Sequence, residues 1–168
     1  MTLEELLASR DRRRDMQARL MEAWPHGTLV VLTVVMPGPQ KQTRSAAIVA
    51  EAAVQALDQA FAGRVLTRTL RDLRTGFEAY YMVQVTADQA KRQAVAIEEK
   101  HALGRLMDID VIGAGCVPYS RTGLQSPPRT CLVCGRPARE CMRSAAHPLD
   151  QLMNRIDELC DGYLLRLH

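Results

Sequence analysis

Aromatic residues and long apolar runs are both scarce in this chain of 168 residues. Phe, Trp and Tyr together make up 4% of it, which argues against a nucleic-acid partner held by stacking bases on exposed rings. The longest apolar run covers residues 29–36 and contains Thr33, far short of the roughly 18 to 20 residues that a membrane-spanning helix needs. We therefore expect neither a nucleic-acid partner nor a membrane partner.

The sequence also lacks the apolar core of a signal peptide, because acidic Glu4 and Glu5 stand near its start. Five cysteines, an odd number, without an export signal indicate reduced thiols and a cytoplasmic protein. The net charge is only +3, although 19 of the 22 basic residues are arginine. Arginine favours forked contacts with phosphate and carboxylate groups, and a coding bias toward arginine is an equally good explanation of the count.

Hydrophobic residues form 47% of the chain and charged residues 24%, as in ordinary globular proteins. Apolar periodicity predicts helices at residues 2–22, 41–61, 87–101 and 148–165, and strands at residues 28–35, 64–73, 77–86 and 105–112. This order of elements predicts the α+β class with a ferredoxin-like βαββαβ core. We expect a single domain over residues 1–168, made of an N-terminal helix (1–22), the core (28–113), a Pro/Cys-rich connecting segment (114–147) and a C-terminal helix (148–168).

The first helix carries an apolar stripe that is interrupted in its middle. Leu3, Leu7 and Met21 stand at the ends of the stripe, and the middle holds polar residues: Arg10, Arg13 or Arg14, and Gln17. A helix packed on a core normally continues its apolar face. The polar residues therefore face either a polar cleft or the solvent.

Two carboxylates, Asp108 and Asp110, lie two residues apart in the last strand of the core, so both side chains point to one face of the sheet. Met107, Ile109 and Val111 fill the other face. The two like charges repel each other, and a divalent cation between them would relieve that repulsion. The pair is a candidate site for Mg²⁺ that bridges to substrate phosphates, although Asp-x-Asp also occurs at solvated strand edges.

The segment MPGPQK, residues 36–41, joins a buried strand to the start of a helix, where free backbone N–H groups favour an anion. Gly38 permits close approach of the backbone to such a ligand, and Lys41 adds a positive charge. The segment lacks the glycine pattern of a Walker loop, which excludes a nucleoside triphosphatase of that type. A rigid Pro-Gly-Pro turn without a ligand is the alternative.

Two residues near the carboxylate strand are candidates for a general base. His101 precedes the turn at Gly104, and Glu98 lies one turn earlier on the same helix. The alternatives are a histidine that caps the C-terminus of its helix and an ordinary surface carboxylate.

Four potential metal ligands, Cys131, Cys134, Cys141 and His147, follow a C-x2-C-x6-C-x5-H spacing. A CxxC pair commonly supplies two ligands to a tetrahedral zinc ion, and four protein ligands would leave no coordination position open. The sequence therefore predicts a possible structural Zn²⁺ site in a segment with little apolar core. Packed reduced thiols or a redox-sensitive CxxC pair are the alternatives.

RNA recognition competes as a function for a basic ferredoxin-like domain, because the segment RTGFEAYYMVQV, residues 74–85, has an outward likeness to the aromatic strand of such modules. Side chains alternate between the two faces of a strand, so Tyr80 is the only aromatic residue of this segment on the face opposite the apolar one. Base stacking needs a second exposed ring. This interpretation is therefore disfavoured.

Several blocks of the sequence, taken in order, resemble a known family. The blocks are SRD at residues 9–11, MPGPQK at 36–41, HALGRLMDIDV at 101–111, SR at 120–121 and PPRTCLVC at 127–134, followed by Cys141, Arg143 and His147. Together they resemble citrate lyase holo-acyl-carrier-protein synthase, also described as apo-citrate lyase phosphoribosyl-dephospho-CoA transferase. The resemblance covers nearly the whole chain.

The resemblance implies a nucleotidyltransferase. Such an enzyme moves the phosphoribosyl-dephospho-CoA prosthetic group from 2′-(5″-triphosphoribosyl)-3′-dephospho-CoA to a serine of the apo citrate lyase acyl carrier protein, the gamma subunit, and pyrophosphate leaves. The implied partners are this carrier protein and the triphosphoribosyl substrate. The alternative is a non-catalytic ferredoxin-like module that binds a phosphate, a nucleotide or RNA.

The chemistry of the residues assigns their roles within this reaction. Asp108 and Asp110 hold magnesium, and Glu98 or His101 takes the serine proton. The expected phosphate contacts come from one glycine and four basic residues: Gly38, Lys41, Arg10, Arg105 and Arg121. Because carrier proteins are usually acidic, we expect the carrier to dock on the arginines of the first helix, residues 12–14.

Overall fold

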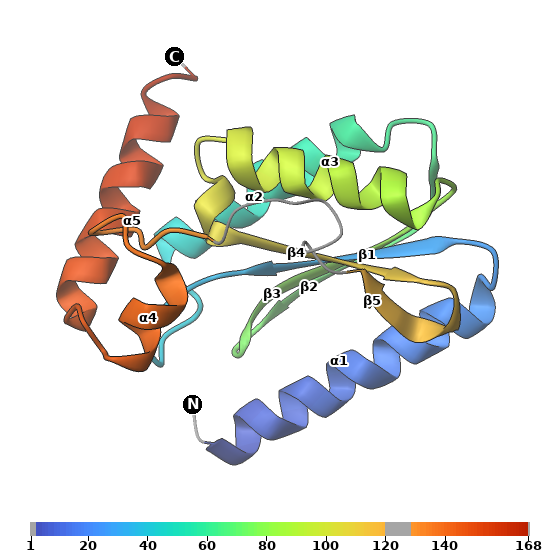
Figure 1. Cartoon of the computed structure of the whole chain (residues 1–168), viewed down its shortest axis with the longest axis horizontal. Helices are drawn as coiled ribbons and strands as arrows, with labels where there is room; N and C mark the ends of the chain where they lie inside the picture. The colour runs from blue at the N-terminus through green and yellow to red at the C-terminus, as the bar shows by residue number, and fades with distance from the viewer. Residues whose placement is uncertain (1–2, 120–128, 168) are drawn as a thin grey trace.

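A five-stranded antiparallel sheet organises the chain, with the strands in the order β2-β3-β1-β4-β5 (Figure 1). The computed structural model describes residues 3–119 and 129–167. The strands are β1 (Thr28–Val34), β2 (Val65–Leu73), β3 (Gly76–Val83), β4 (Met107–Gly113) and β5 (Val117–Tyr119). The α-helices are α1 (Leu3–Ala23), α2 (Arg44–Ala60), α3 (Ala87–Lys100), α4 (Ala138–Arg143) and α5 (Leu149–Leu164), and two 3-10 turns are η1 (Gly104–Leu106) and η2 (Ala114–Cys116).

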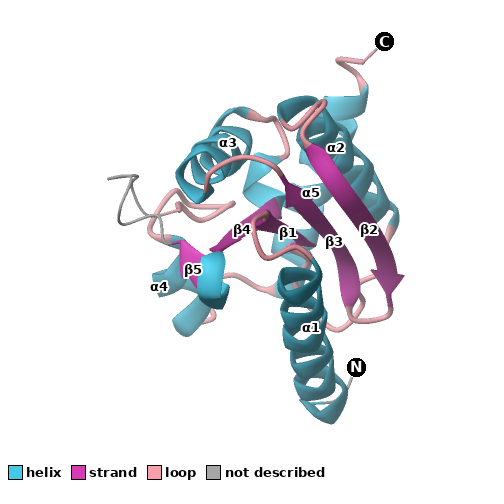
Figure 2. Ribbon diagram, turned by 90° about the vertical axis from the view of Figure 1, so that its right-hand side faces the viewer, coloured by secondary structure: helices cyan, strands magenta, loops and turns pink. Residues whose placement is uncertain are grey.

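The first four strands have the predicted ferredoxin-like arrangement. β1 pairs antiparallel with both β3 and β4, and β3 pairs antiparallel with β2. Consequently β1 and β2, which α2 joins, run parallel with β3 between them, and β3 and β4, which α3 joins, run parallel with β1 between them. These are the two split βαβ units of the βαββαβ fold. Helices α2 and α3 cover one face of the sheet, and α1 lies on the other (Figures 1 and 2).

Strand β1 is buried on both faces, as its almost continuous apolar sequence predicts. Val30 and Leu32 join the main core under α2 and α3. Leu29 and Val31 join a smaller cluster on the opposite face, where Met21 of α1 packs. The C-terminal half of α1 therefore covers the sheet with apolar contacts.

The second face of the sheet is thus closed at the position where RNA-recognition modules expose aromatic rings. Tyr80 on β3 points to this face, but its side chain is 1% exposed beneath α1. Its ring is therefore a core residue and has no free face for a base.

The segment after Gly113 contains more regular structure than the sequence indicates. The predicted connecting segment, residues 114–147, includes a strand that was not expected, because β5 extends the sheet by pairing with β4, with Val111 opposite Tyr119. A strand of three exposed residues has no periodicity of its own to predict, and its partner strand decides it. The short helix α4 was likewise not expected.

The C-terminal helix α5 packs against the main core at one end of the sheet (Figure 1). Ile156 and Cys160 are fully buried in that core, and Ser45 of α2 donates a hydrogen bond of 2.5 Å to Asp157. Within the described ranges, no helix is both long and apolar enough to cross a membrane.

Candidate functional site

The sheet face on the α1 side changes from apolar to polar at the end where β1 leaves the sheet. Four residues form a lateral row there: Arg71 on β2, Glu78 on β3, Thr33 on β1 and Asp108 on β4 are successive register partners. Asp110 follows Asp108 on the same face, because Met107, Ile109 and Val111 belong to the core on the opposite face. The sheet therefore presents charged groups beside the N-terminal half of α1.

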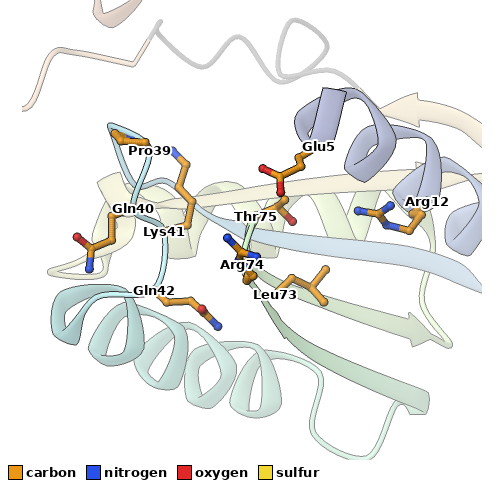
Figure 3. Close-up of a pocket in the computed structure, with 9 residues that line it drawn as sticks. All are labelled: Glu5, Arg12, Pro39, Gln40, Lys41, Gln42, Leu73, Arg74 and Thr75. Carbon is orange, nitrogen blue, oxygen red and sulfur yellow. The ribbon is translucent and has the colours of Figure 1, made fainter. Parts of the chain in front are cut away.

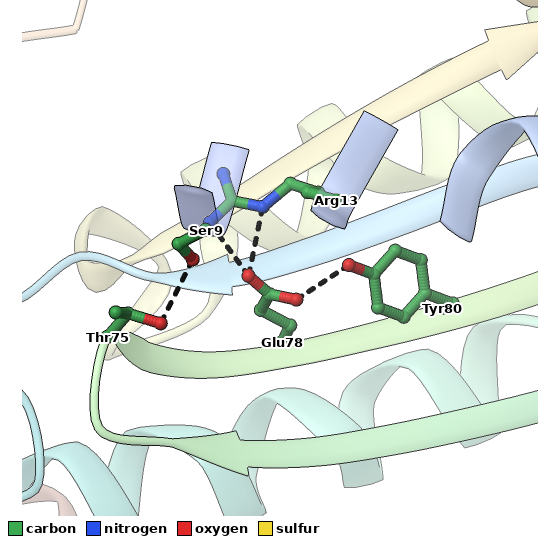
Figure 4. Close-up of polar contacts among 5 residues, drawn as sticks. All are labelled: Ser9, Arg13, Thr75, Glu78 and Tyr80. Carbon is green, nitrogen blue, oxygen red and sulfur yellow. Dashed lines mark hydrogen bonds and ion pairs between the residues drawn. The ribbon is translucent and has the colours of Figure 1, made fainter. Parts of the chain in front are cut away.

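An ion pair connects α1 to this polar row (Figure 4). The Arg13 Nε and Nη2 groups donate to Glu78 Oε1 at 3.1 and 2.9 Å, and the Tyr80 hydroxyl donates to Glu78 Oε2 at 2.6 Å. Nearby, the Ser9 hydroxyl donates to Thr75 Oγ1 at 3.0 Å. Of the polar interruption predicted on the first helix, Arg13 thus faces the sheet, where Glu78 helps to hold the helix in place.

A pocket of about 430 Å³ opens between α1, the β1–α2 loop and the β2–β3 hairpin (Figure 3). Its lining combines three basic side chains with one acidic and several uncharged residues: Arg12, Lys41, Arg74, Glu5, Pro39, Gln40, Gln42, Leu73 and Thr75. The volume falls in the range of small-molecule sites. The excess of basic groups makes it suited to an anion.

The β1–α2 loop forms part of the pocket wall, and contacts at Gly38 and Lys41 help to hold it in place. Gly38 adopts φ of +76°, and a Cβ there would lie 2.9 Å from Leu149 Cδ2 of α5. The Lys41 ammonium group donates to the Met36 carbonyl. Partial burial lowers the pKa of Lys41.

The other predicted phosphate contacts are placed less uniformly. Arg10 is exposed on α1, while Arg12, two residues later, lines the pocket. Arg105 is half-buried in η1. Arg121 lies outside the described residues. The pocket therefore brings Lys41 together with Arg12 and Arg74, which the sequence patterns did not single out as phosphate ligands.

Asp108 and Glu98 are joined by an arginine that was also missed. Arg129 Nη2 lies 3.1 Å from Asp108 Oδ1 and donates to Glu98 Oε1 as well. Its place in the PPRTCLVC block was the signal available in the sequence. The two carboxylates share one guanidinium, which fixes the orientation of Asp108 on the sheet face.

Glu98 has a structural role at the edge of β4. Its Oε1 accepts the backbone N–H of Ile109 at 2.7 Å, and the Lys91 ammonium donates to the Ile109 carbonyl at 3.3 Å. Both side chains come from α3 and are buried, and they satisfy backbone groups that β5 does not reach. Because the Glu98 side chain is only 2% exposed, the structure argues against its role as a base toward a protein-bound serine.

Asp110 is the more exposed member of the carboxylate pair. Loss of solvent around the carboxyl group, and secondly the charge of Asp108, raise the pKa of Asp110. No third carboxylate or histidine joins these two in a potential ligand group within residues 3–119 and 129–167. A cation held here would complete its coordination with water or substrate.

His101 terminates α3 with its imidazole ring partly buried. Its Nδ1 accepts the backbone N–H of Leu103 at 3.0 Å, and its ring lies 5.3 Å from that of Tyr163. Burial lowers the pKa of His101. The neutral ring with an occupied Nδ1 leaves an N–H at Nε2, so it offers a proton donor and no free acceptor.

The predicted zinc ligands come together. The Sγ atoms of Cys131, Cys134 and Cys141 and a ring nitrogen of His147 all lie within 4.8 Å of one another. Hydrogen bonds from Arg136 are the main cause that lowers the pKa of the Cys134 thiol to about 6, and loss of solvent raises that of Cys141 to about 11. This is the only group of three or more potential ligands in the described part of the chain.

The fold thus places a pocket with basic side chains at the end of the sheet that carries a pair of carboxylates. The profile of one family, described as apo-citrate lyase phosphoribosyl-dephospho-CoA transferase, matches residues 1–163. The chain belongs to this family.

Individual relatives agree with the family match. A Vibrio cholerae serotype O1 protein named "Probable apo-citrate lyase phosphoribosyl-dephospho-CoA transferase" is 36% identical over 96% of this chain and 93% of its own length. A Streptococcus pyogenes serotype M18 protein of the same name is 30% identical over 96% of this chain and 86% of its own length. "Protein CitXG" of Haemophilus influenzae is 33% identical over 96% of this chain, which spans 35% of that protein.

Proposed function

We propose that this chain transfers the phosphoribosyl-dephospho-CoA group from 2′-(5″-triphosphoribosyl)-3′-dephospho-CoA to a serine of the apo citrate lyase acyl carrier protein, the gamma subunit. The serine Oγ bonds to the phosphorus nearest the ribose, the bond from that phosphorus to the next phosphate breaks, and pyrophosphate leaves. The activity is that of a nucleotidyltransferase. The family match over residues 1–163 is the observation that carries the proposal.

The basic pocket supports a triphosphate-bearing substrate. Arg12, Lys41 and Arg74 approach it from three separate segments of the chain, so their charges can contact different phosphate oxygens. Arginine forks and a lysine point charge are the usual ligands of phosphate. We assign the triphosphate to this pocket, which adjoins the end of the sheet that carries Asp108.

We assign Asp108 and Asp110 to a magnesium ion. Magnesium usually takes one or two protein carboxylates together with water and substrate phosphates, so no third protein carboxylate is required. When bound, the ion would neutralise charge that develops on the departing pyrophosphate. Arg129 keeps Asp108 turned toward this position through its contact of 3.1 Å.

Positioning and charge neutralisation carry most of the catalysis in phosphoryl transfer. Glu98 acts in this proposal by holding Arg129, and His101 keeps a neutral ring. The serine proton then passes to solvent as the Oγ–phosphorus bond forms. No dedicated base is required, because pyrophosphate is a good leaving group.

The carrier protein docks on the exposed arginines of α1 in this proposal. Arg10 and Arg14 are exposed, and they attract an acidic partner. Arg13 is committed to Glu78, so it contributes to the position of α1 and not to docking.

The test is intact-mass spectrometry of apo citrate lyase acyl carrier protein after incubation with this protein, magnesium and the triphosphoribosyl substrate. We expect a mass increase of one phosphoribosyl-dephospho-CoA group and one pyrophosphate per group transferred. A carrier with its acceptor serine changed to alanine is the control for the site of attachment. If the native carrier gains no mass, the proposed function is wrong.

Variants test the assigned carboxylates separately from the function. Asp108→Asn and Asp110→Asn should each lower kcat by about 100-fold or more. Asp88→Asn is the matched control, because Asp88 is also paired with an arginine and its side chain is 48% exposed, against 46% for Asp108. Transfer at an unchanged rate in both site variants would retain the function and remove the magnesium assignment.

A further inference from the structure

Four potential metal ligands converge in the C-terminal third of the chain, outside the proposed transfer site. The Sγ atoms of Cys134 and Cys141 are 3.5 Å apart, and His147 Nε2 lies 3.3 Å from Cys134 Sγ. Cys131 Sγ completes a group in which all ligand atoms lie within 4.8 Å of one another. Ordinary Zn–S and Zn–N bond lengths separate tetrahedral ligand atoms by roughly 3.5 to 3.8 Å. The separations of 3.5 and 3.3 Å are close to this range, and no pair exceeds 4.8 Å, so the four atoms are near enough to share one zinc ion.

Hydrogen bonds around the cluster orient its ligands. His147 Nδ1 lies 3.2 Å from the Gln151 side-chain oxygen, so Nδ1 carries the proton and the Nε2 lone pair points toward the sulfur atoms. Metal-bound histidines nearly always have such a partner on the second nitrogen. The Val133 backbone N–H donates to Cys131 Sγ at 3.5 Å, and Arg136 Nε donates to Cys134 Sγ at 3.4 Å. These donors stabilise thiolates, the form in which cysteine binds a metal.

Cys131 and Cys134 lie on a turn of the backbone. The Cys131 N–H donates to the Arg136 carbonyl at 2.6 Å, and Thr130 forms a bridge with Pro137. Gly135, directly after the CxxC pair, adopts φ of +72°, a conformation that closes the turn and that glycine favours. α4 then supplies Cys141, and the start of α5 follows His147.

Apolar packing does little to hold this segment together. Across residues 129–147 Cys141 is the one side chain that is buried, and Leu132 packs only partly against the main core. A segment with so small a core needs another crosslink to keep one conformation. The thiols are free, since no disulfide joins any of the five cysteines.

We propose that Cys131, Cys134, Cys141 and His147 bind one zinc ion in a closed structural site. Three soft thiolates and an imidazole in tetrahedral array select zinc among the common divalent metals. Four protein ligands leave no open position for a substrate, so the ion crosslinks the segment and takes no part in transfer. It also secures Arg129, two residues before Cys131, whose carbonyl accepts the Ala138 N–H at 2.8 Å.

The first experiment measures the metal content of the purified full-length chain by plasma mass spectrometry, in buffers without a chelator. We expect about one zinc per chain. If the protein is isolated without metal, titration with zinc should restore one tightly held ion that survives gel filtration. Replacement by cobalt should then give the visible absorption of tetrahedral cobalt with thiolate ligands.

Two matched pairs of variants locate the ion. Cys134→Ser and Cys116→Ser both replace an exposed cysteine, and only the first belongs to the cluster. His147→Gln and His26→Gln form the second pair. We expect zinc to fall severalfold in the cluster variants and to stay unchanged in the controls.

A thiol count on the native protein keeps the proposal testable even where a variant fails to fold. With the metal bound, a thiol reagent should modify Cys116 quickly, and removal of zinc should release three further thiols. The proposal is overturned by a metal-free protein that does not take up zinc, by iron in place of zinc, or by a disulfide seen as the loss of two hydrogens in the intact mass.

Discussion

Replacing Arg13 with methionine tests the contact that holds α1 against the sheet. The Arg13 guanidinium makes both hydrogen bonds to Glu78 Oε1, and the Glu78 side chain is only 3% exposed. In the Arg13→Met variant the buried Glu78 carboxylate loses both of these bonds and keeps the hydrogen bond from the Tyr80 hydroxyl. Methionine preserves much of the apolar stem of arginine, so the change mainly removes the charge and the two donors.

The expected loss of stability follows from burial of the two partners. Removing one partner of a fully buried ion pair costs about 3 to 5 kcal/mol. The Arg13 side chain is 32% exposed, so water replaces part of the lost interaction, and we expect Arg13→Met to cost about 2 to 3 kcal/mol. Glu78→Gln keeps the shape of the side chain and should cost about 1 to 2 kcal/mol.

Urea unfolding of the single and double variants measures the coupling between the two side chains. We expect the double variant to lose less than the sum of the single losses, by about 1 to 2 kcal/mol. Arg14→Met is the matched control, because Arg14 is exposed on the same helix and its replacement should change stability by no more than about 0.5 kcal/mol. An Arg13→Met variant as stable as this control, or a coupling near zero, would refute the reasoning.

Three further predictions address other parts of the chain. A Cβ at Gly104 would lie 2.5 Å from two backbone carbonyl oxygens of α3, so Gly104→Ala should lower the free energy of unfolding in urea by about 2 to 4 kcal/mol. A Cβ at Gly63 would have no atom within 4 Å, although φ is +72°, so the control Gly63→Ala should cost only about 1 kcal/mol. The pKa of Asp110 is raised in the folded state, so its ionised form opposes folding. In metal-free buffer Asp110→Asn should therefore increase the free energy of unfolding at neutral pH. The gain should shrink as the pH falls through the raised pKa of the folded state, and it should vanish below 3.8, the unfolded value. An equal gain in the free energy of unfolding at neutral pH and below pH 3.8 would contradict the cause given for the shift in the pKa of Asp110. If the carrier docks on α1, Arg10→Glu with Arg14→Glu should raise the KM for the carrier severalfold and leave the KM for the triphosphoribosyl substrate unchanged.

Local periodicity in the sequence was sufficient to predict most elements of the core. The helices and strands between residues 28 and 113 lie within a few residues of their predicted positions, because each carries its own apolar pattern at the period of a helix or a strand. The shared face of Asp108 and Asp110 follows from the same rule, since residues two apart in a strand point to one side. Short separations in the chain also made the Cys131, Cys134, Cys141 and His147 cluster recognisable as potential metal ligands.

Packing between distant segments decided what the sequence patterns left open. Arg13 and Glu78 are 65 residues apart, and Arg129 and Glu98 are 31 residues apart. No local pattern pairs such residues, because their contact depends on how α1 and the segment after β5 fold back onto the sheet. The same applies to β5, which is a strand only because β4 offers it a free edge.

Tertiary packing likewise decided which residues line the pocket. Arg10 and Arg12 are two residues apart on α1, and a helix turns about 100° per residue, so the two side chains point in different directions. Which of them meets the Lys41 loop depends on how α1 lies on the sheet, and the Arg13–Glu78 ion pair is one of the contacts that fix that position. The sequence by itself determined the elements of the core and the face of its carboxylates, whereas the packing of α1 and of the C-terminal segment decided which charges meet.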